Sequence, residues 1–362
     1  MSDFIPQYKP WLDSAERDAV VRYLDGGGWL TEFTETKHFA DAIASYTGAR
    51  FCSILSNGSV TLTAALLALG VGAGDEVIVP AYTMIATANA VPLSCGATPV
   101  FADVELDTMG IDVDSARAAM TSRTKALMLV SINGRYPRRL DELLSLCRER
   151  KVVVVEDAAQ SLGSFHQGRH VGRCGRVASF SFSMPKIVTT GQGGALITDD
   201  EELFQTIELI RNFGRRQAGI DDHILFGTNF KFTDLQAVIG IEQMKKISIR
   251  VELKKRTYRV LRERLIDRPQ VRFFETSPET TPWFNDVLVE DPVALTKHLK
   301  ARGIGARPFY PVVPTQAPYR LSAGRFPVAA RLSREGLWLP SFAQLTDGEI
   351  DRIVDGIRSF WP

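Results

Sequence analysis

Cysteine and histidine are scarce in this chain, and neither residue type has the spacing of a metal site. The five histidines include one close pair, His166 and His170, but Gly163 and Gly168 predict a turn there rather than a helix that would align the rings. Scattered cysteines without a Cys-x-x-Cys pair are typical of structural thiols in a reducing compartment. We therefore expect no bound metal and no disulfide framework. The cysteines are Cys52, Cys95, Cys147 and Cys174.

The sequence also lacks a long apolar run, a signal-peptide pattern and an excess of one charge. No apolar run approaches the roughly 18 residues that a membrane-spanning helix needs, and the first residues lack the basic-then-apolar order of a signal peptide. The chain has 43 basic and 42 acidic residues, a formal net charge of +1. That balance argues against nucleic acid or a membrane surface as a partner. We expect a cytoplasmic protein whose dispersed basic residues can still meet a phosphorylated small molecule.

Short apolar runs alternate with helix-length segments from residue 50 onward, which predicts a layered α/β fold. Such runs are typical of strands that are buried on both faces of a mainly parallel sheet. We expect three layers, α/β/α, with ligands bound beyond the carboxyl ends of the strands. The predicted strands are residues 52–55, 76–79, 98–102, 126–130, 152–156, 178–182 and 195–198.

At 362 residues the chain is long for one hydrophobic core, so we expect two domains. The larger domain spans residues 1–245 and starts with an extended arm that leads into a helix capped by Ser14. A long helical region, about 233–265 with Thr233 as its cap, should cross to the second domain. That smaller α+β domain spans residues 246–362.

Lys186 lies between a predicted buried strand and a stretch rich in threonine and glycine. An amine in that setting, with hydroxyls and backbone amides nearby, suits an imine with an aldehyde cofactor that also carries a phosphate. An earlier apolar strand ends at Asp157, whose carboxylate suits a protonated pyridine nitrogen. Alone, a lysine is more often a solvated surface charge, and a carboxylate after a strand is more often a helix cap. The combination predicts pyridoxal 5′-phosphate (PLP), bound to Lys186 and paired with Asp157.

Further segments suit the phosphate and the ring of that cofactor. Gly58 and Ser59 follow a predicted strand and open a helix, whose N-terminus is an anion site. Ser181 alternates with aromatic residues in the strand before the lysine, and Gln160 lies close enough to the carboxylate to contact the ring. A capped helix without a ligand and ordinary strand patterning are the alternatives for the two serine segments. The glycines at 70–74 precede a strand, so they predict a turn rather than a dinucleotide-binding motif.

These motifs follow one another in the order and at the spacing of a known family. Over nearly its whole length the chain resembles the sugar aminotransferases of the DegT/DnrJ/EryC1/StrS family, which are fold-type I PLP enzymes. The motifs that carry the resemblance are residues 28–31, 56–58, 79–83, 156–161, 189–194, 233–237 and 339–341, with the segment around Lys186.

The resemblance implies a set of cofactor contacts: Lys186 as the Schiff-base lysine, Asp157 on the pyridine nitrogen, Gln160 and Met84 against the ring, and Gly58, Ser59 and Ser181 at the phosphate. Asn229 would reach the phosphate held by the neighbouring subunit, which implies a homodimer with shared sites. By the same resemblance the amino donor is L-glutamate, its product is 2-oxoglutarate, and the acceptor is a nucleotide-linked keto sugar.

The chain departs from the family pattern where the substrate should lie. Many members have an aromatic residue at the position of Met84, a histidine at that of Phe213, and a His-x-x-Gly turn where this chain has residues 133–137. Candidate contacts to the sugar or the diphosphate are Thr31, Arg135, Arg215, Arg216, Arg307 and Tyr310. For each arginine, a solvated surface charge is the alternative.

Residues 229–234 look more like members that aminate C4 of the sugar than like those that aminate C3. We therefore expect a 4-keto-6-deoxy hexose as acceptor, as in the similar perosamine synthases. Amination at C3, a keto-cyclitol acceptor and a non-catalytic PLP-fold regulator are the alternatives. A dehydratase of the same family is disfavoured, because those members typically carry histidine where this chain has Lys186.

Overall fold

The computed structural model describes residues 4–217 and 219–361, apart from the side chains of residues 94 and 95. The side chain of Cys95, expected to be a structural thiol, thus lies outside the description. Cys52, Cys147 and Cys174 are free. In the described ranges no helix is long and apolar enough to cross a membrane, and no three His, Cys, Asp or Glu residues gather as they would around a metal ion.

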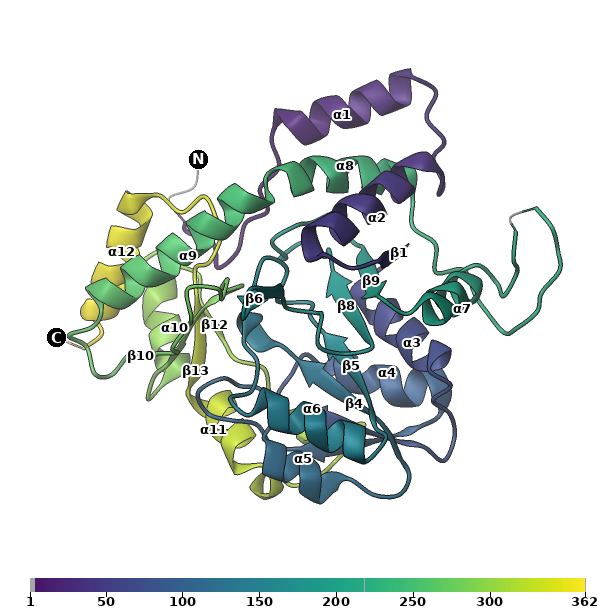
Figure 1. The fold of residues 1–362 in the computed structure, drawn as a ribbon. Helices are drawn as coiled ribbons and strands as arrows, with labels where there is room; N and C mark the ends of the chain where they lie inside the picture. The colour runs from purple at the N-terminus through teal and green to yellow at the C-terminus, as the bar shows by residue number, and fades with distance from the viewer. Residues whose placement is uncertain (1–3, 218, 362) are drawn as a thin grey trace.

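A large, mainly parallel sheet lies at the centre of the molecule (Figure 1). Its strands, in spatial order, are β1 (Phe51–Leu55), β9 (Gly194–Thr198), β8 (Val177–Ser181), β5 (Val153–Asp157), β4 (Thr124–Val130), β2 (Glu76–Pro80) and β3 (Thr98–Ala102). From β8 to β3 neighbouring strands run parallel, whereas β9 is antiparallel to both β8 and β1. The expected fold class, with its mainly parallel sheet, is confirmed.

Helices cover both faces of this sheet because successive strand residues point to opposite faces. Val77 and Val79 pack on one side, in a core with α3, α4 and α7, while Ile78 packs on the other side with α5 and α6. Phe180 and Ile197 pack on that same side against α2 and α8. These helices are α2 (Thr34–Thr47), α3 (Gly58–Ala68), α4 (Ile85–Cys95), α5 (Val113–Ala119), α6 (Leu140–Glu149), α7 (Glu201–Arg211) and α8 (Asp234–Lys245).

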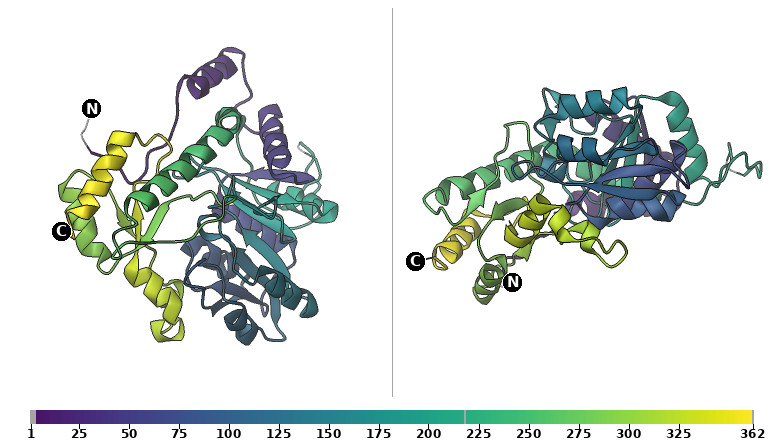
Figure 2. Two further views of the ribbon diagram at one scale, coloured as in Figure 1. Left: turned by 60° about the vertical axis from the view of Figure 1, so that its left-hand side comes forward. Right: turned by 90° about the horizontal axis from the view of Figure 1, so that it is seen from below.

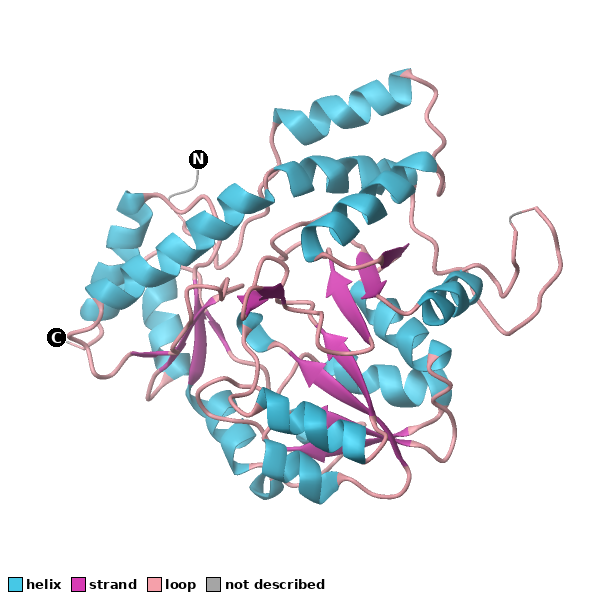
Figure 3. Cartoon of the chain, in the orientation of Figure 1, coloured by secondary structure: helices cyan, strands magenta, loops and turns pink. Residues whose placement is uncertain are grey.

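A smaller antiparallel sheet forms a second centre, which Figure 3 shows as a separate group of strands. Its strands, in spatial order, are β10 (Arg272–Phe273), β11 (Asn285–Leu288), β13 (Gly336–Leu339) and β12 (Arg307–Pro308). Its helices are α9 (Ile247–Arg264), α10 (Pro292–Ala301), α11 (Pro327–Glu335) and α12 (Asp347–Arg358). Short 3₁₀ turns lie at Ile132–Gly134, Val313–Thr315 and Ala323–Arg325, and a hairpin of β6 (Phe165–His166) and β7 (Arg169–His170) contains the expected turn.

The helical region expected at 233–265 is two helices, α8 and α9, which are separated at Lys246 (φ −99°, ψ 3°). Thr233 caps α8 as expected, because its Oγ1 accepts a hydrogen bond from the Gln236 amide at 3.3 Å. The break coincides with the predicted boundary between residues 245 and 246. The division into two domains stays a prediction.

The N-terminal arm runs from the small sheet to the helices that cover the large sheet. Ile5 pairs with Ile304 beside the small sheet, and the arm then leads to α1 (Ser14–Asp25), as Figure 2 shows. Helix α1 packs on α8. Asp13, not Ser14, caps α1: its Oδ1 accepts from the Ala15 amide at 2.9 Å, and the Glu16 side chain returns a bond to the Asp13 amide. The helix therefore begins at Ser14 as expected, but its N-cap is Asp13, one residue earlier than predicted.

Candidate active site

Asp157 and Lys186 lie at the same edge of the large sheet. Asp157 is the last residue of β5, and Lys186 follows the neighbouring parallel strand β8. Because parallel strands share the edge at which they end, both residues reach the region beyond the carboxyl ends of the strands, where α/β proteins bind ligands.

The carboxylate of Asp157 is buried. Its Oδ2 accepts a 2.6 Å hydrogen bond from Thr87 Oγ1, and its Oδ1 accepts from the Ala159 amide at 3.2 Å. Burial raises the pKa of Asp157, against the lowering effects of those two hydrogen bonds and of the Lys186 charge. A buried carboxylate of this kind is stabilised by a cation close to its oxygen atoms. A protonated pyridine nitrogen meets that need.

The amine of Lys186 is shielded by the indole of Trp283. Its Nζ lies 3.8 Å from the ring centroid. Burial lowers the pKa of Lys186 to about 8, against the opposing effect of the Asp157 carboxylate. A substantial neutral fraction near neutral pH suits an amine that must attack an aldehyde.

The N-terminus of α3 closely approaches the end of β8. A Cβ atom on Gly58 would lie 2.7 Å from Cβ of Ser181, so only glycine fits this contact. Asn57 caps the helix by accepting from the Ser59 and Val60 amides, each at 3.0 Å, and Ser59 is exposed. Hydroxyls and the positive end of a helix therefore converge where a phosphate can bind. We call Gly58, Ser59 and Ser181 the phosphate cradle. Together with the Lys186 amine and the Asp157 carboxylate, this cradle fits PLP.

Gln160 and Met84 flank the same region. Gln160 is buried, and its Oε1 accepts a 2.9 Å hydrogen bond from the amide of Asn133. Asn133 is in the left-handed region (φ 53°) and exchanges two side-chain hydrogen bonds with the backbone of Phe284, at 2.9 and 2.7 Å. Met84 is 44% exposed and begins the turn of α4 that carries the Asp157 partner Thr87. Both side chains are thus available to the faces of a bound ring.

Arg135 does not face the site, contrary to the sequence-based expectation. Its guanidinium forms a bidentate pair with Asp286, with N–O distances of 2.7 and 3.0 Å, and both side chains are buried. The Glu275 carbonyl and the Tyr258 hydroxyl accept further bonds from it at 3.2 and 3.3 Å. These contacts use four of the five guanidinium N–H groups, so Arg135 is held away from the site and is not a substrate contact.

Arg307 and Tyr310 stay candidates for the substrate side. Arg307 is exposed at the start of β12, and its guanidinium carbon lies 5.7 Å from the Tyr310 ring centroid. Burial raises the pKa of Tyr310 to about 12, with a lowering effect from Arg307 and a raising effect from Asp157. Tyr310 therefore lies within electrostatic range of Asp157, between the two sheets.

The remaining candidates lie on exposed loops. The connection between α7 and α8 projects from the body of the molecule (Figure 1) and carries Arg215, Arg216 and Asn229. Asn229 is exposed, and the carbonyl of its neighbour Phe230 accepts from the amide of Ser56 at 3.0 Å, beside the phosphate cradle. Thr31 is exposed too, and its carbonyl accepts from the Asp234 amide. Both side chains are thus exposed, and Asn229 Oδ1 accepts a local bond from the Lys231 amide at 3.3 Å.

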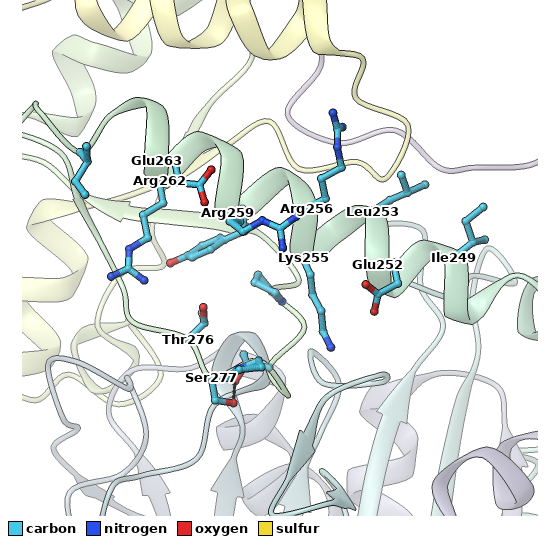
Figure 4. Close-up of a pocket in the computed structure, with 15 residues that line it drawn as sticks. Ile249, Glu252, Leu253, Lys255, Arg256, Arg259, Arg262, Glu263, Thr276 and Ser277 are labelled. Carbon is cyan, nitrogen blue, oxygen red and sulfur yellow. Dashed lines mark hydrogen bonds between the residues drawn. The ribbon is translucent and has the colours of Figure 1, made fainter.

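Sequence patterns missed Thr87 and Trp283. Thr87 lies in the first turn of a helix that follows a strand, and this pattern alone is a weak signal of a functional residue. Trp283 lies 98 residues beyond Pro185, whose carbonyl it binds, so no local pattern links it to the lysine loop. A groove of about 820 Å³ along α9 (Figure 4) contains none of the candidate residues.

Known proteins resemble the chain over its full length. The model of the DegT/DnrJ/EryC1/StrS aminotransferase family matches residues 11–358. A GDP-perosamine synthase of Caulobacter vibrioides is 34% identical over 355 residues, 95% of each chain, and one of Escherichia coli O157:H7 is 31% identical over 361 residues, 99% of each chain. The solved PLP form of Spr1654 from Streptococcus pneumoniae has a TM-score of 0.92 at 26% identity and covers 98% of each chain.

Proposed function

The chain belongs to the DegT/DnrJ/EryC1/StrS aminotransferase family, and we propose that it moves the amino group of L-glutamate to C4 of a nucleotide-linked 4-keto-6-deoxy sugar. As a family member it is a PLP-dependent sugar aminotransferase. The observation that supports the finer proposal is its similarity, over full length, to two GDP-perosamine synthases.

PLP supplies an electron sink for the carbon that loses its proton. In this proposal Lys186 would hold the cofactor, and its amine, once displaced by a substrate amine, would serve as the group that accepts and donates the proton. Asp157 keeps a negative charge against the ring nitrogen. A pKa near 8 suits Lys186 to both directions of proton transfer near neutral pH.

The other site residues bind and orient. We assign the phosphate to Gly58, Ser59 and Ser181, and the ring faces to Gln160 and Met84. On the substrate side we propose Thr31, Arg215, Arg216, Arg307 and Tyr310, which present hydroxyls and cations suited to a sugar diphosphate.

We also propose a cytoplasmic homodimer in which Asn229 reaches the partner's cofactor. Large apolar side chains support it, because Trp29, Phe33 and Phe226 are 64%, 67% and 101% exposed. The free state of the described cysteines agrees with a reducing compartment. Sedimentation as a monomer with full activity would contradict the dimer.

The first experiment separates the two half-reactions. Purified protein with bound PLP is bleached by L-glutamate, freed of glutamate, and mixed with 4-keto-6-deoxy sugars linked to GDP, dTDP or UDP. We expect the yellow absorbance to return with one of them, and Lys186→Ala to lack both the absorbance and turnover.

The other outcomes test the amino donor and the acceptor separately. Bleaching without return would discard the acceptor and keep the aminotransferase, and no bleaching would discard glutamate as donor. If free nucleoside diphosphate does not compete with the acceptor, a keto-cyclitol is favoured over a nucleotide sugar.

A further inference from the structure

The loop that carries Lys186 is held from three distant parts of the chain. The Met184 carbonyl accepts from the Tyr8 hydroxyl of the N-terminal arm. The Pro185 carbonyl accepts from the indole Nε1 of Trp283 at 2.6 Å. On the other side of the lysine, the Ile187 carbonyl accepts from Arg250 Nη1 on α9 at 2.7 Å. The backbone on both sides of Lys186 is therefore fixed by side chains and not by a strand or a helix.

Trp283 differs from the other two holders because it also touches the reactive group. Its ring centroid lies 3.8 Å from Lys186 Nζ, and the residue is 4% exposed. It stacks on Phe284 with 3.8 Å between ring centroids and 22° between planes. The negative face of a ring that is so held stabilises an ammonium group and keeps water away from it.

Lys254 of α9 binds the backbone of Trp283. Lys254 is 7% exposed, its ammonium donates to the carbonyls of Trp283 and Ser341, and no carboxylate pairs with it among the described residues. A buried ammonium without a counter-ion is costly, and burial lowers the pKa of Lys254 to about 7. Lys254 has no catalytic role in the proposed function, yet it binds Trp283, which in turn covers the reactive amine.

We propose that Trp283 is a positioning residue that aims and shields the amine of Lys186, and that Lys254 acts through Trp283. The indole does this with two groups: its N–H fixes the loop at Pro185, and its ring face covers Nζ. The proposal rests on the proposed function, because it takes Lys186 to be the amine that reacts. In the working enzyme the ring would stabilise the proton that Lys186 carries between its two transfers.

The test measures Lys186 itself rather than turnover. Full-length protein freed of cofactor is mixed with PLP across a pH range, the imine is trapped with borohydride, and the labelled Lys186 peptide is quantified. We expect a midpoint near pH 8 for the native chain, in line with the lowered pKa of Lys186. Other titratable or charged groups beside the loop are Asp157, Tyr8, Lys9, Arg250 and Lys254, and they are unchanged in the Trp283 variants.

Trp283→Leu keeps an apolar cover without a ring face or an N–H, so the midpoint should fall by about half a pH unit or more. Trp283→Phe keeps the ring face and loses the bond to Pro185, so its midpoint should fall less than that of Trp283→Leu. An unchanged or raised midpoint in Trp283→Leu, or an equal fall in Trp283→Phe, would overturn the proposal. If the native chain yields no labelled Lys186 peptide at any pH, the proposed function fails and the inference fails with it.

Lys254→Met tests the second half of the proposal. Loss of its bond to the Trp283 carbonyl should move the midpoint in the same direction as Trp283→Leu. Lys255→Met is the matched control, since Lys255 is the next residue of α9 and lines the separate groove of Figure 4. A shift in both variants, or in neither, would show that Lys254 does not act through Trp283.

Discussion

At the scale of single residues, Asp157 and Lys186 depend on burial for their titration. Burial raises the pKa of the carboxyl and lowers that of the amine, so each group is moved toward its neutral form. Their mutual attraction opposes both shifts. The Thr87 hydroxyl adds to that opposition by donating a 2.6 Å bond to the carboxylate. One threonine therefore helps to keep Asp157 charged in a buried site.

Thr87→Val should make the enzyme more sensitive to acid. The Thr87 hydroxyl lowers the Asp157 pKa, so its loss raises that pKa and moves the acid limb of the kcat profile to higher pH. We expect turnover on the acid limb to fall about tenfold while turnover at pH 8.5 changes little. Thr87→Ser keeps the hydroxyl and should keep the profile. An acid limb that does not move in Thr87→Val would mean that Thr87 does not stabilise the charge.

At the scale of elements, the phosphate cradle is a junction between the N-terminus of α3 and the last residue of β8. The two elements approach so closely that a Cβ atom on Gly58 would overlap Ser181. The cap residue Asn57 occupies the Ser59 and Val60 amides, so the ligand must be recognised by the remaining amide, the hydroxyls and the helix dipole.

Gly58→Ala should weaken PLP binding because the new methyl group pushes α3 away from Ser181. An overpacked contact of this kind corresponds to a loss of about tenfold or more in affinity. The measurement is a PLP titration of cofactor-free protein followed by absorbance. Gly72→Ala is the control, since a Cβ there has no atom within 4 Å. Equal affinities for the two variants would contradict the tight junction.

At the scale of the whole molecule, a buried ion pair connects the segment after β4 of the large sheet to the small sheet. Arg135 follows the 3₁₀ turn after β4, and Asp286 lies in β11 of the small sheet. The pair is close to the active site, because Asn133 of the same turn binds both Gln160 and Phe284. Asn133 and Arg135, in the segment 133–137 expected beside the substrate, thus bind residues in or next to β11 of the small sheet.

Arg135→Met should destabilise the protein strongly, because it leaves the Asp286 carboxylate buried without its partner. We expect the free energy of unfolding in urea, followed by circular dichroism, to fall by about 3–5 kcal/mol. Arg138→Met removes the exposed pair with Asp107 and should cost at most about 1 kcal/mol. The double variant Arg135→Met/Asp286→Leu should recover part of the loss. A loss in Arg135→Met no larger than in Arg138→Met would refute this role.

The sequence by itself determined the fold class and the placement of Asp157, Lys186 and Gly58 at the ends of strands and the start of a helix. These features are local, because the spacing of apolar residues, a glycine at a helix start and a carboxylate after a strand depend on neighbouring residues. They also carry the family resemblance, which the match over residues 11–358 confirms.

Only the tertiary structure decided which long polar side chains are free and which are held. Arg135 looked like a substrate contact, yet Asp286 from a distant strand buries it. Trp283 carried no local signal, yet it covers the amine of Lys186. The physical reason is that the burial and pairing of a long side chain are set by whatever packs against it, and those partners are distant in sequence.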